Sequence, residues 1–342
     1  MNRRAFLLSS GTVLVTSGAL RMLPDVVHAS ELNRASGITG SNKYEGIMHI
    51  PFYFVDVFAE RPLSGNPLAV VPDAQSLDDA TMQQIAAELN QAETTFIFPP
   101  RSKSADWRLR SLTAPGHEIF GVGHNSLGAW WWLAESGRLK LSDGSNHFTQ
   151  EIGHDLLPVD VRYKDGQVVS VVLTQSPPEF ARVCEDFFGL AEALGLREAD
   201  ISRSLPAQVV STGAGHLLVP VHTRSAIERA HPDSQRLAKV LKAVGGEGCY
   251  IYCLEPVSMS SVAHARFFNP TMGIVEDSAT GTAAGPLACQ LVKHGIAKDG
   301  STMRIEQGYE MKRPSILTVE VHGNVVRLAG RGVRVIEGTL RV

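Results

Sequence analysis

Two stretches of the chain read alike, Gly123-His124-Asn125-Ser126-Leu127-Gly128 and Gly281-Thr282-Ala283-Ala284-Gly285-Pro286. Each is a glycine turn that runs into a mostly apolar helix, and the two turns are separated by about half the length of the chain. Strands outnumber helices around them and do not alternate strictly with helices, as they would in a doubly wound parallel sheet. We therefore expect an α+β fold of two related domains, in which two helix starts face one cleft.

Short segments rich in β-branched and aromatic residues predict the strands of this fold. They cover residues 52–58, 68–71, 94–98, 107–112, 168–173, 216–221, 249–254 and 263–268. Apolar residues at helical spacing predict helices near residues 127–133, 234–244 and 283–294.

One more helix has a start signal and an end signal of its own. Ser76 and Asp79 form a capping-box pattern, apolar residues follow at helical spacing, and the helix should end near Asn90. A strand begins at Thr94, so Glu93 occupies the tight corner between helix and strand.

Glu93 is the candidate catalytic base. Burial raises the pKa of a carboxyl group, and removal of a carbon-bound proton requires a base with a raised pKa in a site that excludes water. The same group can then return the proton to another carbon. A solvated cap between helix and strand is the alternative role for a lone glutamate.

The two glycine turns are candidate anion sites. The first N–H groups of a helix lack internal partners and carry partial positive charge, and glycine lets the backbone approach a ligand closely. Two such starts, at Gly123 and Gly281, would hold a carboxylate. The alternative is that these glycines only serve packing.

Composition excludes several functions. The formal net charge is −3 with both signs interspersed, so no basic surface for nucleic acid is expected, and an anionic substrate must be held by local donors. The 12 histidines show no metal-binding spacing, so no metal is expected. The four cysteines do not form a disulfide framework, and packing in the core is their expected role.

The N-terminus has the features of an export signal. Arg3 and Arg4 precede a short apolar stretch, and small residues before Ser30 suit cleavage there. Residues 1–29 are therefore predicted to be a twin-arginine signal peptide, with residues 30–47 as a flexible lead-in and the mature protein in the periplasm. A cytoplasmic location is the alternative. No later segment has the roughly 18 consecutive apolar residues of a membrane span.

Several segments, in order, resemble the PhzF-like family of phenazine biosynthesis. The resemblance covers nearly all of residues 52–342 and is carried by residues 58–71, 90–96, 120–124, 210–216, 267–285, 305–308 and 313–315. It implies a diaminopimelate-epimerase-like fold of two pseudo-symmetric domains, each a β-sheet curled around a central helix. The implied domains are residues 48–165 and 166–332, and the last strand, near 333–342, joins the first domain.

The resemblance also implies an activity and its residues. The family's catalytic glutamate falls on Glu93, and its substrate-binding residues fall on His124, Asp277 and Thr282 beside the two turn glycines. A homodimer without a cofactor is implied, acting on a small anionic substrate. Epimerases of this fold use two cysteines at the glycine turns, but this chain has Val122 and Thr280 there, so a two-thiol mechanism is excluded.

We therefore expect an isomerase in which one glutamate moves a proton between carbons of a small carboxylate-bearing substrate. Two other hypotheses stay open. The first is a non-catalytic small-molecule binding protein on the same fold, and the second is a redox enzyme, suggested by twin-arginine export. Asn125 and Ser278 stand where the family often has proline, which leaves the natural substrate open.

Overall fold

The computed structural model describes residues 47–342, of which residues 48–342 form one compact unit. The predicted signal peptide and nearly all of the predicted lead-in lie outside the described residues. No helix in the described part of the chain is long and apolar enough to cross a membrane.

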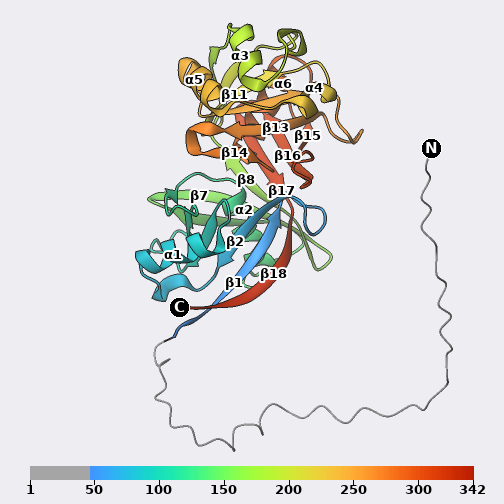
Figure 1. Ribbon diagram of the computed structural model, residues 1–342. Coiled ribbons are helices and arrows are strands. Elements are labelled where there is room, and N and C mark those ends of the chain that lie inside the picture. The colour runs from blue at the N-terminus through green and yellow to red at the C-terminus, as the bar shows by residue number, and fades with distance from the viewer. Residues whose placement is uncertain (1–46) are drawn as a thin grey trace, which may run out of the picture. The chain divides into compact units, whose positions relative to one another are not determined.

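Strands make up most of the secondary structure, as Figure 1 shows. Their bounds are β1 His49–Val57, β2 Asn66–Val71, β3 Thr94–Phe98, β4 Trp107–Leu112, β5 Glu118–Ile119, β6 Gly144–Ile152, β7 Asp155–Lys164, β8 Gln167–Gln175, β9 Glu179–Val183, β10 Gln208–Ser211, β11 Gly215–Pro220, β12 Gly248–Cys253, β13 Ala263–Asn269, β14 Ile274–Asp277, β15 Thr302–Gln307, β16 Ser315–His322, β17 Val325–Gly330 and β18 Gly332–Arg341.

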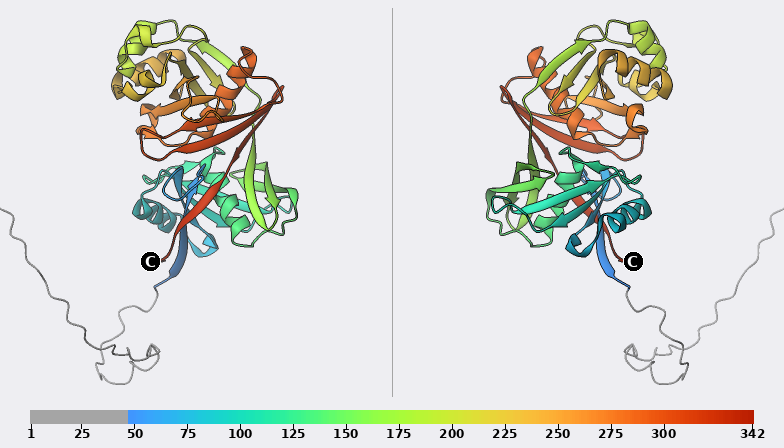
Figure 2. Two further views of the ribbon diagram at one scale, coloured as in Figure 1. Left: turned by 90° about the vertical axis from the view of Figure 1, so that its right-hand side faces the viewer. Right: turned by 90° about the vertical axis from the view of Figure 1, so that its left-hand side faces the viewer.

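These strands form one continuous hydrogen-bonded sheet in which most neighbours are antiparallel. Strand β8 joins the strands of the first half of the chain to those of the second half, because it pairs with β7 on one side and with β17 on the other. The last strand, β18, returns to pair with β1 along its whole length, and Figure 2 shows the two running side by side. The mixed, strand-dominated architecture confirms the predicted α+β class.

Six helices of the described residues pack on this sheet. They are α1 Asp79–Leu89, α2 His124–Glu135, α3 Phe187–Leu194, α4 Arg224–Arg229, α5 Ser234–Val244 and α6 Gly281–Lys293. Helix α2 packs against seven strands, β1 to β4, β7, β8 and β18, and α6 packs against β10, β11, β16 and β17. These two helices are buried over most of their length. Both are apolar on all sides, so burial against the surrounding strands removes their whole surface from water.

The other helices cover the outer faces. Helix α1 packs through Met82 and Ile85 on β3 and β4, and α4 packs on β12 and β13. Helices α3 and α5 pack on each other and share an apolar cluster with β10 to β13. In Figure 1 α1, α2 and β18 lie in the lower part, with α3 to α6 in the upper part. The predicted boundary between two domains at residues 165 and 166 falls in the turn between β7 and β8, and it stays a prediction.

Two predicted helix starts differ from the structure. The start of α1 is capped by Asp78, whose side chain accepts a hydrogen bond from the N–H of Thr81, so the predicted Ser76 cap is wrong. Ser76 is the last residue of a short 3-10 helix, Ala74–Ser76, which precedes α1 in the chain. Helix α2 begins at His124, three residues before the apolar run that predicted it.

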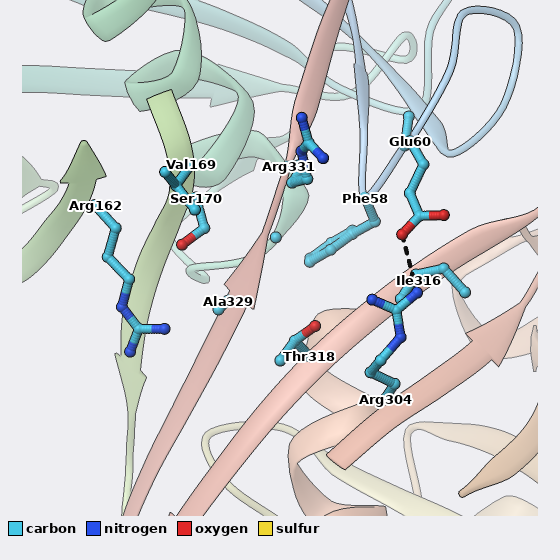
Figure 3. Close-up of a pocket in the computed structure, with 12 residues that line it drawn as sticks. Phe58, Glu60, Arg162, Val169, Ser170, Arg304, Ile316, Thr318, Ala329 and Arg331 are labelled. Carbon is cyan, nitrogen blue, oxygen red and sulfur yellow. Dashed lines mark hydrogen bonds and ion pairs between the residues drawn. The ribbon is translucent and has the colours of Figure 1, made fainter. Parts of the chain in front are cut away.

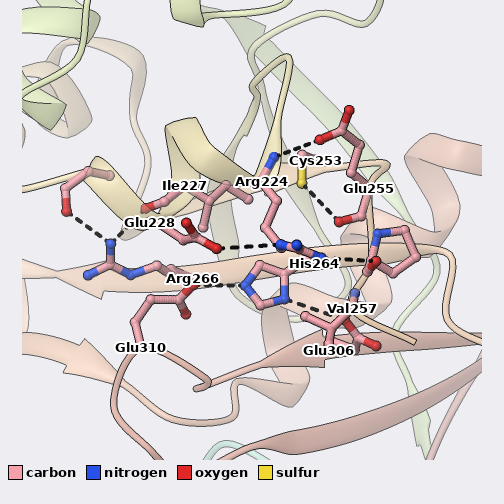
Figure 4. A network of polar contacts seen from close by, with 12 residues as sticks. Arg224, Ile227, Glu228, Cys253, Glu255, Val257, His264, Arg266, Glu306 and Glu310 are labelled. Carbon is pink, nitrogen blue, oxygen red and sulfur yellow. Dashed lines mark hydrogen bonds and ion pairs between the residues drawn. The ribbon is translucent and has the colours of Figure 1, made fainter. Parts of the chain in front are cut away.

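A network of charged side chains surrounds His264 on strand β13 (Figure 4). His264 on β13 lies between two carboxylates, with Nε2 2.8 Å from Glu310 and Nδ1 3.4 Å from Glu306. Glu306 also accepts hydrogen bonds from the N–H groups of Val257 and Ser258. Burial acts to lower the pKa of His264, but the two carboxylates outweigh it and raise that pKa to about 9.

Candidate active site

Glu93 lies in the corner where the sequence predicts it. Helix α1 ends at Asn90 in the left-handed conformation, which turns the chain into the fully buried strand β3. The carboxyl oxygen Oε2 of Glu93 is buried and has no hydrogen-bond partner in the described residues. The side chain as a whole is 18% exposed, and this burial, which removes most of the water that would solvate the ionised form, raises the pKa of Glu93 to about 7.

His124 is the first residue of α2, and its ring faces Glu93. The distance from Nε2 of His124 to Oε2 of Glu93 is 4.0 Å, and Nε2 is likewise buried without a hydrogen-bond partner. Burial lowers the pKa of His124, while the nearby charge of Asp277 opposes that shift. Two buried polar atoms that face each other without a hydrogen-bond partner are rare in native proteins, which makes this pair a candidate for contact with a ligand.

Asp277 ends strand β14 just before α6, and two side chains hold its carboxylate. Asn66 donates from Nδ2 at 2.8 Å and Thr280 donates from its hydroxyl at 2.6 Å. Burial raises the pKa of Asp277, although His124 and these two donors act to lower it, and the charge of Glu93 acts to raise it further. The structure thus brings Glu93, His124 and Asp277 into electrostatic contact.

The turn before α2 is held by its own asparagine. Asn125 accepts a hydrogen bond from the N–H of Gly123 at 2.9 Å and donates to the carbonyl of Gly121 at 3.0 Å. A Cβ added at Gly123 would meet only Asn125 Oδ1, at 3.7 Å, which is ordinary contact. Packing therefore does not require glycine at 123, and close approach of a ligand remains as a physical reason for it.

Gly281 differs from Gly123 in this respect. A Cβ at Gly281 would collide with the side chain of Leu328 and approach Phe58 Cζ at 3.5 Å, so this glycine is needed for packing at the start of α6. Its carbonyl accepts a hydrogen bond from Gln175 at 2.9 Å. Packing is therefore one physical reason for glycine at 281, and its predicted role in substrate binding stays a prediction.

Thr282, in the first turn of α6, presents its hydroxyl to a histidine. Its Oγ1 lies 3.1 Å from Nε2 of His216 on β11, and Nδ1 of His216 is buried without a partner. Burial lowers the pKa of His216 to about 4, so the ring is neutral near neutral pH. Thr282 therefore faces a neutral, buried partner.

Sequence reasoning missed the residues that support Asp277. Asn66 and Gln307 lie in two of the segments that carry the family resemblance. Nothing in the neighbouring sequence shows that both side chains form hydrogen bonds to Asp277. Gln307 donates to the carbonyl of Asp277 at 2.7 Å and to Thr280 Oγ1 at 3.0 Å. The loop before Asn66 is in turn held by Arg313, which donates to the carbonyl of Gly65 and to Asp56.

The described residues include no group of three or more His, Cys, Asp or Glu side chains that could hold a metal ion. The cysteines are all free and buried, as expected for core residues. The predicted absence of a metal and a cofactor stays a prediction.

The fold has known counterparts. The hydroxyproline epimerase of Agrobacterium vitis aligns over 86% of this chain and 93% of its own, with a TM-score of 0.60 at 13% identity, a likeness in fold alone. The phenazine biosynthesis protein of the PhzF family from Bacillus anthracis aligns over 86% of this chain and all of its own, with a TM-score of 0.79 at 30% identity. The structure therefore has the predicted diaminopimelate-epimerase-like fold.

Sequence comparison identifies the family. Residues 55–338 match the PhzC-PhzF family, described as phenazine biosynthesis-like protein. The trans-2,3-dihydro-3-hydroxyanthranilate isomerase of Pseudomonas fluorescens is 31% identical over 295 residues, which cover 84% of this chain and 98% of that protein. The chain belongs to the PhzC-PhzF family and is an isomerase.

Proposed function

We propose that Glu93 moves a proton between two carbon atoms of a small, carboxylate-bearing substrate. The observation that carries this proposal is the buried, unpartnered carboxyl oxygen of Glu93, whose pKa of about 7 lies close to the working pH of the cell. General acid and base catalysis is most efficient under that condition. A protein that only bound its ligand would need no such group.

The proposed reaction uses one residue twice. The Glu93 carboxylate takes a proton from a substrate carbon, and the electron pair of that C–H bond enters the conjugated system of the substrate. The resulting carboxylic acid then gives the proton to a different carbon, which restores the carboxylate without a net change in charge. His124 and Asp277, which lie beside Glu93, orient the polar groups of the substrate.

Backbone donors are suited to bind the substrate carboxylate. The N–H groups at the starts of α2 and α6 carry partial positive charge, and the space at Gly123 allows an anion to approach. Trans-2,3-dihydro-3-hydroxyanthranilate, named for the Pseudomonas relative, is the first substrate to test. Other small cyclic carboxylates can then be screened by whether they raise the unfolding temperature of the protein.

The pH dependence of kcat/KM tests the role of Glu93. The base form must be deprotonated, so kcat/KM should fall about tenfold per pH unit below about pH 7. The measurement is a pH profile in buffers of constant ionic strength with the substrate that the wild type converts. An acid limb centred near 4.5, the ordinary value for glutamate, would contradict a buried catalytic carboxyl.

Export and assembly are proposed on sequence alone. We expect a mature N-terminus at Ser30 in the periplasmic fraction, and a homodimer as the resemblance implies. Changing Arg3→Lys together with Arg4→Lys should abolish delivery, as read by N-terminal sequencing of fractionated cells. Full-length protein in the cytosol of wild-type cells would show instead that residues 1–29 are not a signal.

A further inference from the structure

We propose that Thr280 and Gln307 are positioning residues of the isomerase, which hold the carboxylate of Asp277 as a hydrogen-bond acceptor for the substrate. The inference deepens the proposed function and rests on it. The family resemblance assigns a role to Asp277 but to neither of these two residues. Their role follows from a chain of hydrogen bonds in which each donor has a fixed direction.

The side-chain amide of Gln307 has one orientation that satisfies its neighbours. Gln307 is the last residue of β15 and is fully buried. Its Oε1 accepts from the N–H of Thr280 at 3.1 Å, and its Nε2 donates to the carbonyl of Asp277 at 2.7 Å. A backbone N–H can only donate and a carbonyl can only accept, so these two contacts decide which amide atom is nitrogen.

A buried tyrosine supports the same orientation. The hydroxyl of Tyr250, on β12, donates to Oε1 of Gln307 at 3.0 Å. Burial raises the pKa of Tyr250, so its hydroxyl stays protonated at neutral pH and remains a donor. Oε1 of Gln307 thus accepts two hydrogen bonds, and the amide cannot turn over without breaking both.

The amide nitrogen in turn directs the hydroxyl of Thr280. Nε2 of Gln307 lies 3.0 Å from Oγ1 of Thr280 and can only donate there, so the hydroxyl hydrogen points to Oδ2 of Asp277, 2.6 Å away. Thr280 is the N-cap residue of α6, yet its side chain forms no capping hydrogen bond within the described part of the chain. Threonine at an N-cap usually accepts from the first helical N–H groups. Here its hydroxyl serves Asp277 instead.

The other oxygen of Asp277 has a donor of equally fixed direction. Nδ2 of Asn66 donates to Oδ1 of Asp277 at 2.8 Å and to the carbonyl of Ala279 at 3.0 Å. Each carboxylate oxygen can accept more than one hydrogen bond, so both keep the capacity to bind an N–H or O–H of a ligand. The electrostatic contact of Asp277 with His124 and Glu93 places that capacity at the catalytic site.

Strand β15 keeps this chain of hydrogen bonds apart from two ion pairs. Side chains alternate along a strand, so Arg304 and Glu306 project from the face opposite to Gln307. Figure 3 shows Arg304 with Glu60, at 2.9 Å, and Figure 4 shows Glu306 beside His264. Substitutions at Gln307 should leave both ion pairs in place.

Kinetics of Thr280→Val and Thr280→Ser test the role, with the substrate that the wild type converts. Valine has nearly the shape of threonine but no hydroxyl, so Asp277 loses a donor. We expect kcat to fall about tenfold or more while KM stays within about threefold, because the substrate still binds but is held out of line with Glu93. Serine keeps the hydroxyl and should retain kcat within about threefold. Full activity of Thr280→Val would overturn the proposal.

A double variant tests whether both residues act through the same carboxylate. Gln307→Met removes the amide at similar size and should lower kcat about tenfold. Added to Thr280→Val, it should lower kcat less than about threefold further, because the hydrogen bond that it directs is already lost. Losses that multiply in full would contradict a shared action on Asp277.

Thr223→Val is the matched control for loss of stability. The hydroxyl of Thr223 caps α4 by accepting from the N–H of Ala226 at 3.2 Å. Its removal should lower the unfolding temperature but leave kcat within about twofold of the wild type. An equal loss of kcat in Thr223→Val and Thr280→Val would reduce the effect to stability. If Glu93→Gln is inactive while Thr280→Val is fully active, the positioning role fails and the proposed function stands.

A titration of Asp277 itself needs no substrate. The full chain, with isotope-labelled aspartate carboxyl carbons, is titrated by NMR, and the Asp277 signal is assigned by its absence in Asp277→Asn. The groups that face this carboxylate are Glu93, His124 and Tyr250, which both Thr280 variants keep. Loss of a donor to the ionised form should move the titration to higher pH in Thr280→Val but not in Thr280→Ser. An unchanged titration in Thr280→Val would show that Thr280 does not act on Asp277.

Discussion

Glu93→Gln is expected to reduce kcat by about 10³-fold or more, because an amide can neither take up nor return a proton at neutral pH. The side chain keeps its size, so substrate binding should change little and KM should stay within a few fold. Steady-state kinetics with the substrate that the wild type converts provides the measurement. Glu88→Gln, on an exposed position of α1, is the matched control and should retain full activity.

The same variant should fold at least as well as the wild type. The pKa of Glu93 is raised in the folded state to about 7, so the ionised form weakens folding as pH rises above the unfolded value of 4.5. Glutamine has no such cost, and at about pH 8 the variant should unfold at a higher temperature than the wild type. A variant that is inactive and also less stable would indicate a structural role instead.

His264→Leu is expected to destabilise the fold by about 3 kcal/mol at a pH near 6, since it leaves the buried Glu306 and the partly buried Glu310 without their shared cation. The folded pKa of His264, about 9, exceeds its ordinary 6.5, so its stabilising contribution is complete below 6.5 and is lost as pH rises through 9. The difference between variant and wild type should therefore narrow at alkaline pH. Urea unfolding across the pH range measures it.

A matched control is His154→Leu, which alters an exposed histidine in the turn between β6 and β7. It should change the free energy of unfolding by less than about 0.5 kcal/mol. A loss in His264→Leu that is small, or that stays constant from pH 6 to pH 9, would contradict a charged histidine between Glu306 and Glu310.

Local signals in the sequence predicted the catalytic corner well. Asn90 tolerates the left-handed conformation that ends α1, and the β-branched run from Thr94 continues as a buried strand, so the position of Glu93 follows from its neighbours. A helix was predicted near residues 234–244 from apolar residues at helical spacing, and α5 has these bounds, with Gly245 in the left-handed conformation at its end. The resemblance to the family supplied His124 and Asp277.

Long-range contacts could not be predicted in this way. Asn66 and Asp277 are 211 residues apart, and only the folded sheet shows that the amide donates to the carboxylate. His216 is a single histidine in an apolar strand, a pattern that more often indicates a core residue than a site residue. The wrong cap at Ser76 has a local cause, because Asp78 competes for the same helix start and its extended backbone suits that position.

The central claim is that Glu93 carries hydrogen between carbon atoms of the substrate. Turnover in deuterated water by the wild type and by Glu93→Gln, followed by NMR of the product, tests it most directly. We predict that the wild type incorporates deuterium at the newly protonated carbon, because the protonated, partly exposed Glu93 carboxyl exchanges with solvent before it protonates that carbon, and that Glu93→Gln forms no labelled product on the same time scale. Labelled product formed by Glu93→Gln at the wild-type rate would contradict the account.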